Sequence, residues 1–137
     1  MNEKKLKRLI KDTIESSKND LEKKIEIMAI ITEALKKIDV RPVIVGGQAV
    51  EFYTSGGYAT MDIDMLCERS IADIHSVLSP LGFIREGKYW TLEKGNINIV
   101  IEVPSGPLAG DWKRLTKVET KQGLNAYFIG IEDIIID

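Results

Sequence analysis

The chain has 137 residues, is 44% hydrophobic and carries a formal net charge of -2. This length favours one domain with its own core and is too short for two ordinary domains. The small negative charge excludes an overall field that would attract nucleic acid, and no apolar run approaches the ~20 residues needed to cross a bilayer. The basic start lacks the apolar core of a signal peptide, so we expect a cytoplasmic protein that is not targeted to membranes.

Two segments near the N-terminus have helical spacing. Residues 3–16 and 20–38 repeat apolar side chains every three or four positions, and Asn19 stands where it can cap the second helix. In the second segment the apolar stripe is expected to run along Leu21, Ile25, Met28, Thr32 and Leu35. We therefore expect residues 1–40 to supply packing helices and residues 41–137 to form the core of a single domain.

The segment Arg41–Tyr53 predicts a buried strand, a turn at Gly46-Gly47 and then a helix. The first amides of such a helix have no acceptor within it and carry the positive end of its dipole, which suits a phosphate. Gly46, Gly47 and the adjacent Gln48 are therefore candidate phosphate-binding residues. A glycine pair alone is weak evidence, because a strand-to-helix turn needs glycine for steric reasons.

Apolar and polar residues alternate from Ala59 to Cys67, which predicts a strand with one apolar face. Asp62 and Asp64 share the other face. Two ionised carboxylates this close repel each other, and the remedies are a raised pKa, a basic partner or a hard divalent cation such as Mg²⁺. Cys67 belongs to the apolar face, cannot form an internal disulfide and is interpreted as an inert buried thiol.

The next segments predict a helix and then several strands. Ser70 resembles the start of a capping box for a helix that ends near Leu78, and the lone His75 on it is interpreted as structural or solvent-facing. Strands are expected at residues 83–85, 89–92 and 97–103, with a hairpin turn at Gly95-Asn96. In the last of these strands Asn98 and Glu102 fall on the polar face, so Glu102 can join the aspartates if the two strands pair.

The C-terminal part predicts a loop over residues 104–110, a ribbon from residues 112–120 and 124–129, and a short terminal helix. The expected fold class is α/β, or α+β, with a mixed and largely antiparallel sheet. We expect helices to cover one face of that sheet and the acidic site to lie on the other. An acidic pair alone could simply make one face of a strand soluble. The order of the acidic pair relative to the glycine pair and to Glu102 therefore decides between this structural role and a metal site.

The order of these motifs resembles the nucleotidyltransferase superfamily, whose fold is that of the DNA polymerase beta palm. Val45-Gly46-Gly47, then Asp62-Ile63-Asp64, then Glu102 on a later strand match its signature residue by residue. The local sequences Gly46-Gly47-Gln48-Ala49-Val50 and Thr60-Met61-Asp62-Ile63-Asp64 are most similar to those of the small prokaryotic branch that includes the AbiEii-type toxins. The resemblance covers residues 41–137, and such relatives continue into further helices, so the chain is either a minimal or a truncated version.

The resemblance implies metal-dependent transfer of a nucleoside monophosphate from a nucleoside triphosphate to an acceptor hydroxyl, with Mg²⁺ or Mn²⁺. It assigns the metal and the catalytic role to Asp62, Asp64 and Glu102, and the phosphates to Gly46, Gly47 and Gln48. The acceptor, whether RNA, a protein or a small molecule, is left open. The alternative is a non-catalytic protein of the same fold, a toxin-antitoxin or regulatory subunit that binds a protein partner.

Overall fold

A computed structural model of the protein describes residues 2–44, 51–55, 58–94, 97–103 and 116–128. The α-helices in this part of the chain are α1 (Glu3–Glu15), α2 (Asp20–Leu35) and α3 (Ile71–Leu78), and the 3-10 helices are η1 (Lys36–Ile38) and η2 (Ser79–Leu81). The strands are β1 (Val43–Ile44), β2 (Glu51–Ser55), β3 (Tyr58–Leu66), β4 (Ile84–Glu86), β5 (Tyr89–Lys94), β6 (Ile97–Glu102), β7 (Thr116–Glu119) and β8 (Asn125–Phe128).

The strands form a mixed sheet in the order β4-β5-β6-β3-β1-β8-β7, and β2 also pairs with β3. The pairs β3–β6 and β1–β8 are parallel, whereas β1–β3, β2–β3, β4–β5, β5–β6 and β7–β8 are antiparallel. The prediction of a mixed, largely antiparallel sheet combined with helices is therefore confirmed. The predicted ribbon near the C-terminus is β7 with β8, and the expected terminal helix lies outside the described residues.

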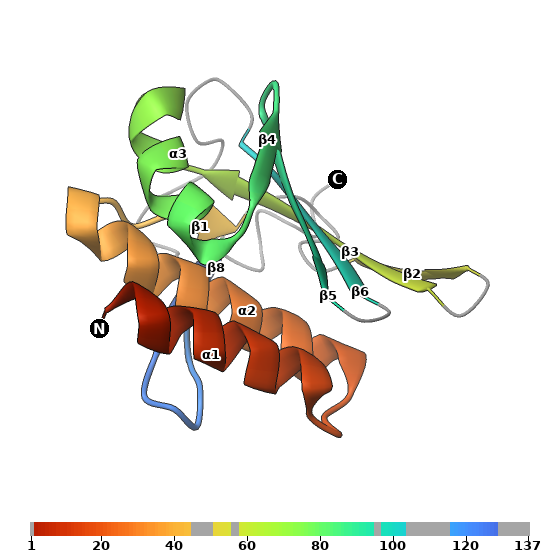
Figure 1. The fold of residues 1–137 in the computed structure, drawn as a ribbon. Coiled ribbons are helices and arrows are strands. Elements are labelled where there is room, and N and C mark those ends of the chain that lie inside the picture. The colour runs from red at the N-terminus through yellow and green to blue at the C-terminus, as the bar shows by residue number, and fades with distance from the viewer. Residues whose placement is uncertain (1, 45–50, 56–57, 95–96, 104–115, 129–137) are drawn as a thin grey trace, which may run out of the picture.

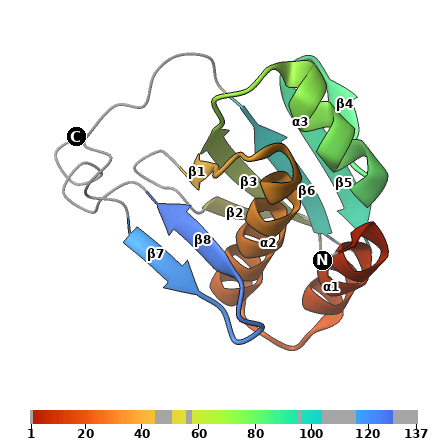
Figure 2. The same ribbon diagram turned by 90° about the vertical axis from the view of Figure 1, so that its left-hand side faces the viewer.

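The helices cover one face of the sheet (Figures 1 and 2). Helix α2 contacts α1, α3 and β8, so it is enclosed on several sides. Its buried side chains consequently run without interruption from Glu26 to Thr32, and Ile25, expected on the buried stripe, is only half-buried. The simple stripe predicted for this helix was too narrow, because a helix surrounded by other elements buries more than one face.

Local capping groups fix where the helices begin. The side chains of Asn2, Asn19 and Ser70 accept hydrogen bonds from the backbone N–H groups of the residues three positions further on. Each bond satisfies an N–H group that has no acceptor within its helix. The predicted caps at Asn19 and Ser70 are therefore confirmed.

The helix expected after Gly47 is wrong for residues 51–53, because they belong to strand β2. This strand pairs antiparallel with β3, from Glu51 opposite Asp62 to Ser55 opposite Tyr58. The register leaves a two-residue connection, Gly56-Gly57, which is the loop length that hairpins favour. Aromatic and β-branched side chains also fit a strand better than a helix, and the run Phe52-Tyr53-Thr54 consists of these types.

The strands on either side of the turn predicted at Gly95-Asn96 pair as a hairpin requires, and the two turn residues lie outside the described residues. Lys94 pairs with Ile97, and the antiparallel register continues to Tyr89 opposite Glu102. A two-residue connection fixes this register, because each step away from the turn pairs the next residue of each strand. Tyr89 is thereby placed beside Glu102.

Among the described residues, no helix is long and apolar enough to span a membrane.

One hydrogen bond ties α3 to the sheet. The Nε1–H group of Trp90, which is fully buried on β5, donates to Nδ1 of His75 at 3.1 Å. An indole N–H can only donate, so it needs an acceptor when it is buried. His75 is half-buried and supplies that acceptor. The interpretation of His75 as a structural residue is therefore confirmed.

We expect His75→Ala to lower the free energy of unfolding by about 1–3 kcal/mol, because the buried Trp90 N–H group loses its acceptor. Urea unfolding followed by tryptophan fluorescence measures this change. Ser76→Ala, at the next and exposed position of α3, is the control and should stay within about 0.5 kcal/mol of the parent. Equal stabilities for the two variants would contradict the structural role of His75.

Candidate functional site

Strand β3 carries the two predicted aspartates on the face of the sheet opposite the helices. Met61, Ile63 and Met65 are at most 1% exposed and pack in the core, whereas Asp62 is half-buried and Asp64 is exposed. Alternation along a strand therefore separates the apolar face from the acidic one. The predicted face assignment is confirmed, and we call the uncovered side of the sheet the open face.

Strand β6 brings the third acidic residue to the same place. It lies parallel to β3, with Asp62 opposite Val100 and Asp64 opposite Glu102. Paired residues of neighbouring strands point to the same face, and the strands are about 4.8 Å apart. The predicted pairing of these strands is confirmed, so Glu102 lies directly beside Asp64 although 37 residues separate them in the sequence, from 65 to 101.

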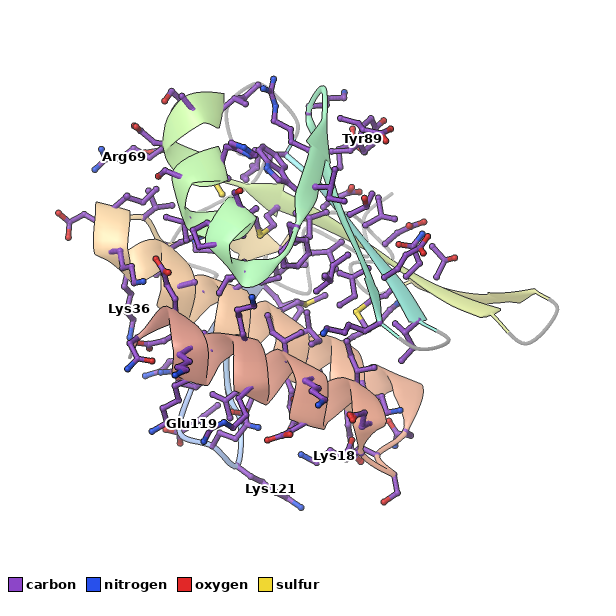
Figure 3. All side chains as sticks on the ribbon, in the orientation of Figure 1. Lys18, Lys36, Arg69, Tyr89, Glu119 and Lys121 are labelled. Atoms are coloured by element: carbon purple, nitrogen blue, oxygen red, sulfur yellow. The ribbon has the colours of Figure 1, made fainter. Side chains whose placement is uncertain are left out.

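These residues line a hollow on the open face with a volume of about 220 Å³. Its walls are formed by Asp62, Ile63, Asp64, Tyr89, Val100 and Glu102, and we call it the acidic hollow. A water molecule occupies about 30 Å³ in the liquid, so the acidic hollow can hold a hydrated cation or a phosphate group, and a whole nucleotide would extend beyond it. Figure 3 shows Tyr89 projecting from β5 on the side of the sheet away from α1 and α2.

A lysine lies against the acidic hollow. Nζ of Lys88 is 3.1 Å from Oε2 of Glu102, and it lies 6.0 Å from the ring centroid of Tyr89. The hydrogen bond and charge of Glu102 raise the pKa of Lys88, with smaller contributions from Tyr89 and Asp64 in the same direction. Of the three remedies for carboxylate repulsion, the structure therefore supplies a basic partner at Glu102.

The donor chemistry of the acidic hollow fits a hard divalent cation only in part. Carboxylate oxygens are suitable ligands for Mg²⁺, and three carboxylates share this face. Within the described part of the chain, however, no group of three or more acidic, histidine or cysteine side chains is gathered closely enough to hold a metal. Glu102 is directed to Lys88, and Asp62 and Asp64 each take part in other polar or electrostatic interactions. A cation would have to draw the three side chains together.

The candidate phosphate-binding residues Gly46, Gly47 and Gln48 lie outside the described residues. The strands on either side nevertheless locate the ends of their segment. Ile44, at the end of β1, pairs with Met65, and Glu51, at the start of β2, pairs with Asp62. The segment that joins β1 to β2 therefore starts beside β3 on one side of Asp64 and ends beside β3 on the other side. Residues 51–53, which were expected to continue the helix that presents amides to phosphate, belong to β2 instead.

Sequence reasoning missed Lys88 and Tyr89 as members of the site. Tyr89 could have been found by extending the two-residue hairpin of β5 and β6 from Lys94 and Ile97, which leads to the pair Tyr89 and Glu102. The contact between Lys88 and Glu102 depends on a flexible side chain. No periodicity in the sequence predicts such a contact.

Comparison of the chain with protein-family models, curated proteins and solved structures found no match. The site is therefore interpreted from its own geometry and charges.

Cys67 follows β3 on the side of the apolar face and packs against the core. It is half-buried, and burial raises the pKa of its thiol from 9.0 to about 12. The thiol is therefore protonated at neutral pH, which agrees with the interpretation of an inert residue. Because the pKa is higher in the folded state than in the unfolded state, the stabilising contribution is complete below pH 9.0 and is lost as the pH rises toward 12.

We expect iodoacetamide to alkylate Cys67 slowly at pH 8, because the thiolate is the reacting species and little of it is present. The rate should rise about tenfold for each pH unit while the fold persists. Mass spectrometry of quenched samples measures the modified fraction. The same chain in urea is the control and should react as a free cysteine, whereas equal rates in both states would show that Cys67 is accessible.

We expect Lys88→Met to increase the affinity of the acidic hollow for Mn²⁺ at least about twofold, because Glu102 loses its competing cation. Isothermal titration calorimetry gives the affinity. Lys94→Met removes the same charge from an exposed position at the far end of β5, the strand that follows Lys88, so it controls for the general electrostatic effect.

Combining Lys88→Met with Glu102→Gln should cancel the gain, since the two residues act through one contact. Identical affinities for the Lys88→Met and Lys94→Met variants would contradict a role for Glu102 in binding the metal.

Proposed function

We propose that the chain is a metal-dependent nucleotidyltransferase that moves a nucleoside monophosphate from a nucleoside triphosphate to an acceptor hydroxyl. One observation carries the proposal. Glu102 lies opposite Asp64 on a neighbouring parallel strand, and Asp62 shares their face and lines the same hollow. Two carboxylates two residues apart with a third on the adjacent strand suit paired divalent cations in phosphoryl transfer.

The proposed roles follow from charge and position. Asp62 and Asp64 would hold Mg²⁺ or Mn²⁺, and the cation would neutralise phosphate charge and polarise the reacting phosphoryl group. Glu102 would join them as a metal ligand and would lie beside the acceptor hydroxyl in the same hollow. The hydroxyl oxygen forms a bond to the α-phosphorus as the bond to pyrophosphate breaks, and the hydroxyl proton passes to a carboxylate or to solvent. Gly46, Gly47 and Gln48 are assigned to the phosphates, because their segment begins and ends beside Met65 and Asp62.

Lys88 gains a role in this proposal that the sequence did not suggest. In the absence of metal it neutralises Glu102. If the carboxylates held a divalent cation, it would replace the lysine at Glu102, and the ammonium group of Lys88 could then pair with the triphosphate, which carries the opposite charge. The turn between β4 and β5 thus supplies the cation that the resting site needs and a phosphate ligand for the loaded site.

The second candidate function is a non-catalytic binding protein of the same fold, such as a toxin-antitoxin or regulatory subunit. The ion pair between Lys88 and Glu102 favours it, because a carboxylate already paired with lysine needs no metal to relieve its charge. In this case the open face serves a protein partner, and the chain turns over no nucleotide. A protein of this kind would have neither an acceptor hydroxyl nor a nucleotide as substrate.

We expect a nucleoside triphosphate to bind at least about tenfold more tightly with Mg²⁺ than in EDTA, because the cation offsets repulsion between phosphate and carboxylates. Calorimetry with each of the four triphosphates measures the difference, and release of pyrophosphate reports turnover. Asp64→Asn should abolish the metal-dependent part without unfolding the chain, since Asp64 is exposed.

Asp73→Asn changes an exposed aspartate on α3 and is the matched control, which should behave like the parent. Equal affinity in EDTA would contradict the metal bridge. Metal-dependent binding without pyrophosphate release, in the presence of a range of hydroxyl acceptors, would favour the binding protein.

A further inference from the structure

A second cavity opens near the C-terminal end of β3. Its volume is about 510 Å³, which lies in the range of sites that bind small molecules. Two chain segments line it, one leading into β1 and the other leading from β3 to α3. We call it the arginine cavity, and its residues are Asp39, Val40, Arg41, Leu66, Glu68 and Arg69.

The charged side chains of the arginine cavity are not paired with one another. Arg41 and Arg69 are exposed, and the ion pairs within the described part of the chain join other residues. Asp39 and Glu68 line the same space and are also exposed. Two guanidinium groups and two carboxylates thus border one cavity without neutralising each other. Such a wall can bind a ligand that has both an anionic group and hydrogen-bond donors.

One of the guanidinium groups is held in place by an aromatic ring. Cζ of Arg41 lies 4.7 Å from the ring centroid of Tyr127 on β8, within the distance of a cation–π interaction. A stacked guanidinium keeps its edge free to donate two parallel hydrogen bonds to a phosphate or carboxylate. This contact restricts the Arg41 side chain before a ligand arrives, which reduces the entropy lost on binding.

The second segment of the wall is anchored by α3. Arg69 and Glu68 directly precede Ser70, whose side chain caps this helix. Figure 3 shows Arg69 projecting outward from this segment. The backbone on the opposite wall is fixed as well, because Asp39 takes the left-handed conformation with φ 56° and its N–H group donates to the carbonyl oxygen of Lys36. Short polar residues such as aspartate tolerate this conformation.

We propose that the arginine cavity binds a small phosphate ester that also carries hydroxyl or amino groups. The phosphate lies between Arg41 and Arg69, where it accepts charge-assisted hydrogen bonds. The hydroxyl or amino groups donate to Asp39 and Glu68. Inorganic phosphate satisfies only the arginines, and an uncharged polyol satisfies only the carboxylates, so the ester binds best.

The arginine cavity is adjacent to the acidic hollow. Leu66 follows Asp64 by two residues on β3 and shares its face, so the two positions are about 7 Å apart along the strand. If the proposed transfer reaction takes place, a hydroxyl group of the bound ester is within reach of the acceptor position. This assignment of the acceptor as a phosphorylated hydroxyl compound rests on the proposed function, whereas binding of the ester does not.

Nuclear magnetic resonance of the ¹⁵N-labelled chain in EDTA tests the binding, with ribose 5-phosphate, inorganic phosphate and ribose as probes. We expect ribose 5-phosphate to cause saturable shifts in the amides of residues 39–41 and 66–69, with millimolar or tighter affinity. Inorganic phosphate should bind more weakly, and ribose should leave these amides unchanged. Absence of saturable shifts with ribose 5-phosphate would overturn the proposal, and equal affinity for inorganic phosphate would overturn the assignment of an ester.

Variants identify the residues responsible. Arg41→Gln and Arg69→Gln should each weaken ribose 5-phosphate at least about tenfold, because each removes a charge-assisted hydrogen bond. Arg41→Lys should also weaken it, since lysine lacks the planar fork. Arg85→Gln removes an exposed arginine on β4 and is the matched control, which should bind like the parent. Unchanged affinity in both Arg41→Gln and Arg69→Gln, with intact folds by circular dichroism, would overturn the site.

Asp64→Asn separates this proposal from the proposed function. Binding of ribose 5-phosphate in EDTA should be the same in this variant, whereas metal-dependent binding of a nucleoside triphosphate should be lost. Loss of ribose 5-phosphate binding in Asp64→Asn would place the ester in the acidic hollow and overturn the proposal. Retention of ester binding in a chain that never binds a triphosphate would leave the arginine cavity established and the transferase function rejected.

Discussion

The parallel pairing of β3 with β6 is the constraint on which the rest of the structure depends. The apolar side chains of both strands are at most 1% exposed beneath the helices. They are Met61 and Ile63 on β3 and Ile99 and Ile101 on β6. Each such side chain contributes about 1.5–3 kcal/mol when it is fully buried. A slip by one residue would turn these groups to solvent and the acidic residues into the core. The register that places Glu102 beside Asp64 is therefore maintained by packing on the opposite face.

The negative charge of Glu102 on the open face is neutralised by Lys88, and another cation can replace this lysine. Lys88 pairs with Glu102 at the exposed edge of the acidic hollow, where both side chains remain in contact with water. Exposed ion pairs contribute little to stability and exchange partners readily. The fold consequently does not depend on this contact, and a cation or a polyanion can change it at low cost. The two candidate functions differ in whether a metal takes the place of the lysine.

The open face combines two environments that follow from one strand. Asp62 and Asp64 line the acidic hollow, and Leu66, the next residue of β3 on that face, lines the arginine cavity. Arg41 and Tyr127 approach the arginine cavity from elements distant in the sequence. An acidic site beside a cavity lined by two exposed arginines suits the two ends of one ligand, or two ligands side by side. The covered face, in contrast, is filled by helices and serves stability.

The sequence by itself determined the elements and the faces of the strands. Alternation of apolar and polar residues identified β3 and β6 and placed Asp62, Asp64 and Glu102 on their polar sides, and local capping residues located the starts of α2 and α3. These features could be predicted because each depends only on residues a few positions apart in the sequence. The helix assigned after Gly47 was wrong for residues 51–53, because Phe52 and Tyr53 have aromatic side chains that favour a strand and this segment pairs with β3.

Only the tertiary structure decided which distant residues meet. The parallel order of β3 and β6 sets Glu102 against Asp64, and that order arises from how the whole sheet packs on the helices. The contacts of Lys88 with Glu102 and of Arg41 with Tyr127 depend on long side chains reaching across elements. Periodicity carries no information about such contacts, because it reports the direction of a side chain relative to its own strand or helix. Which residues lie opposite is settled by packing between elements.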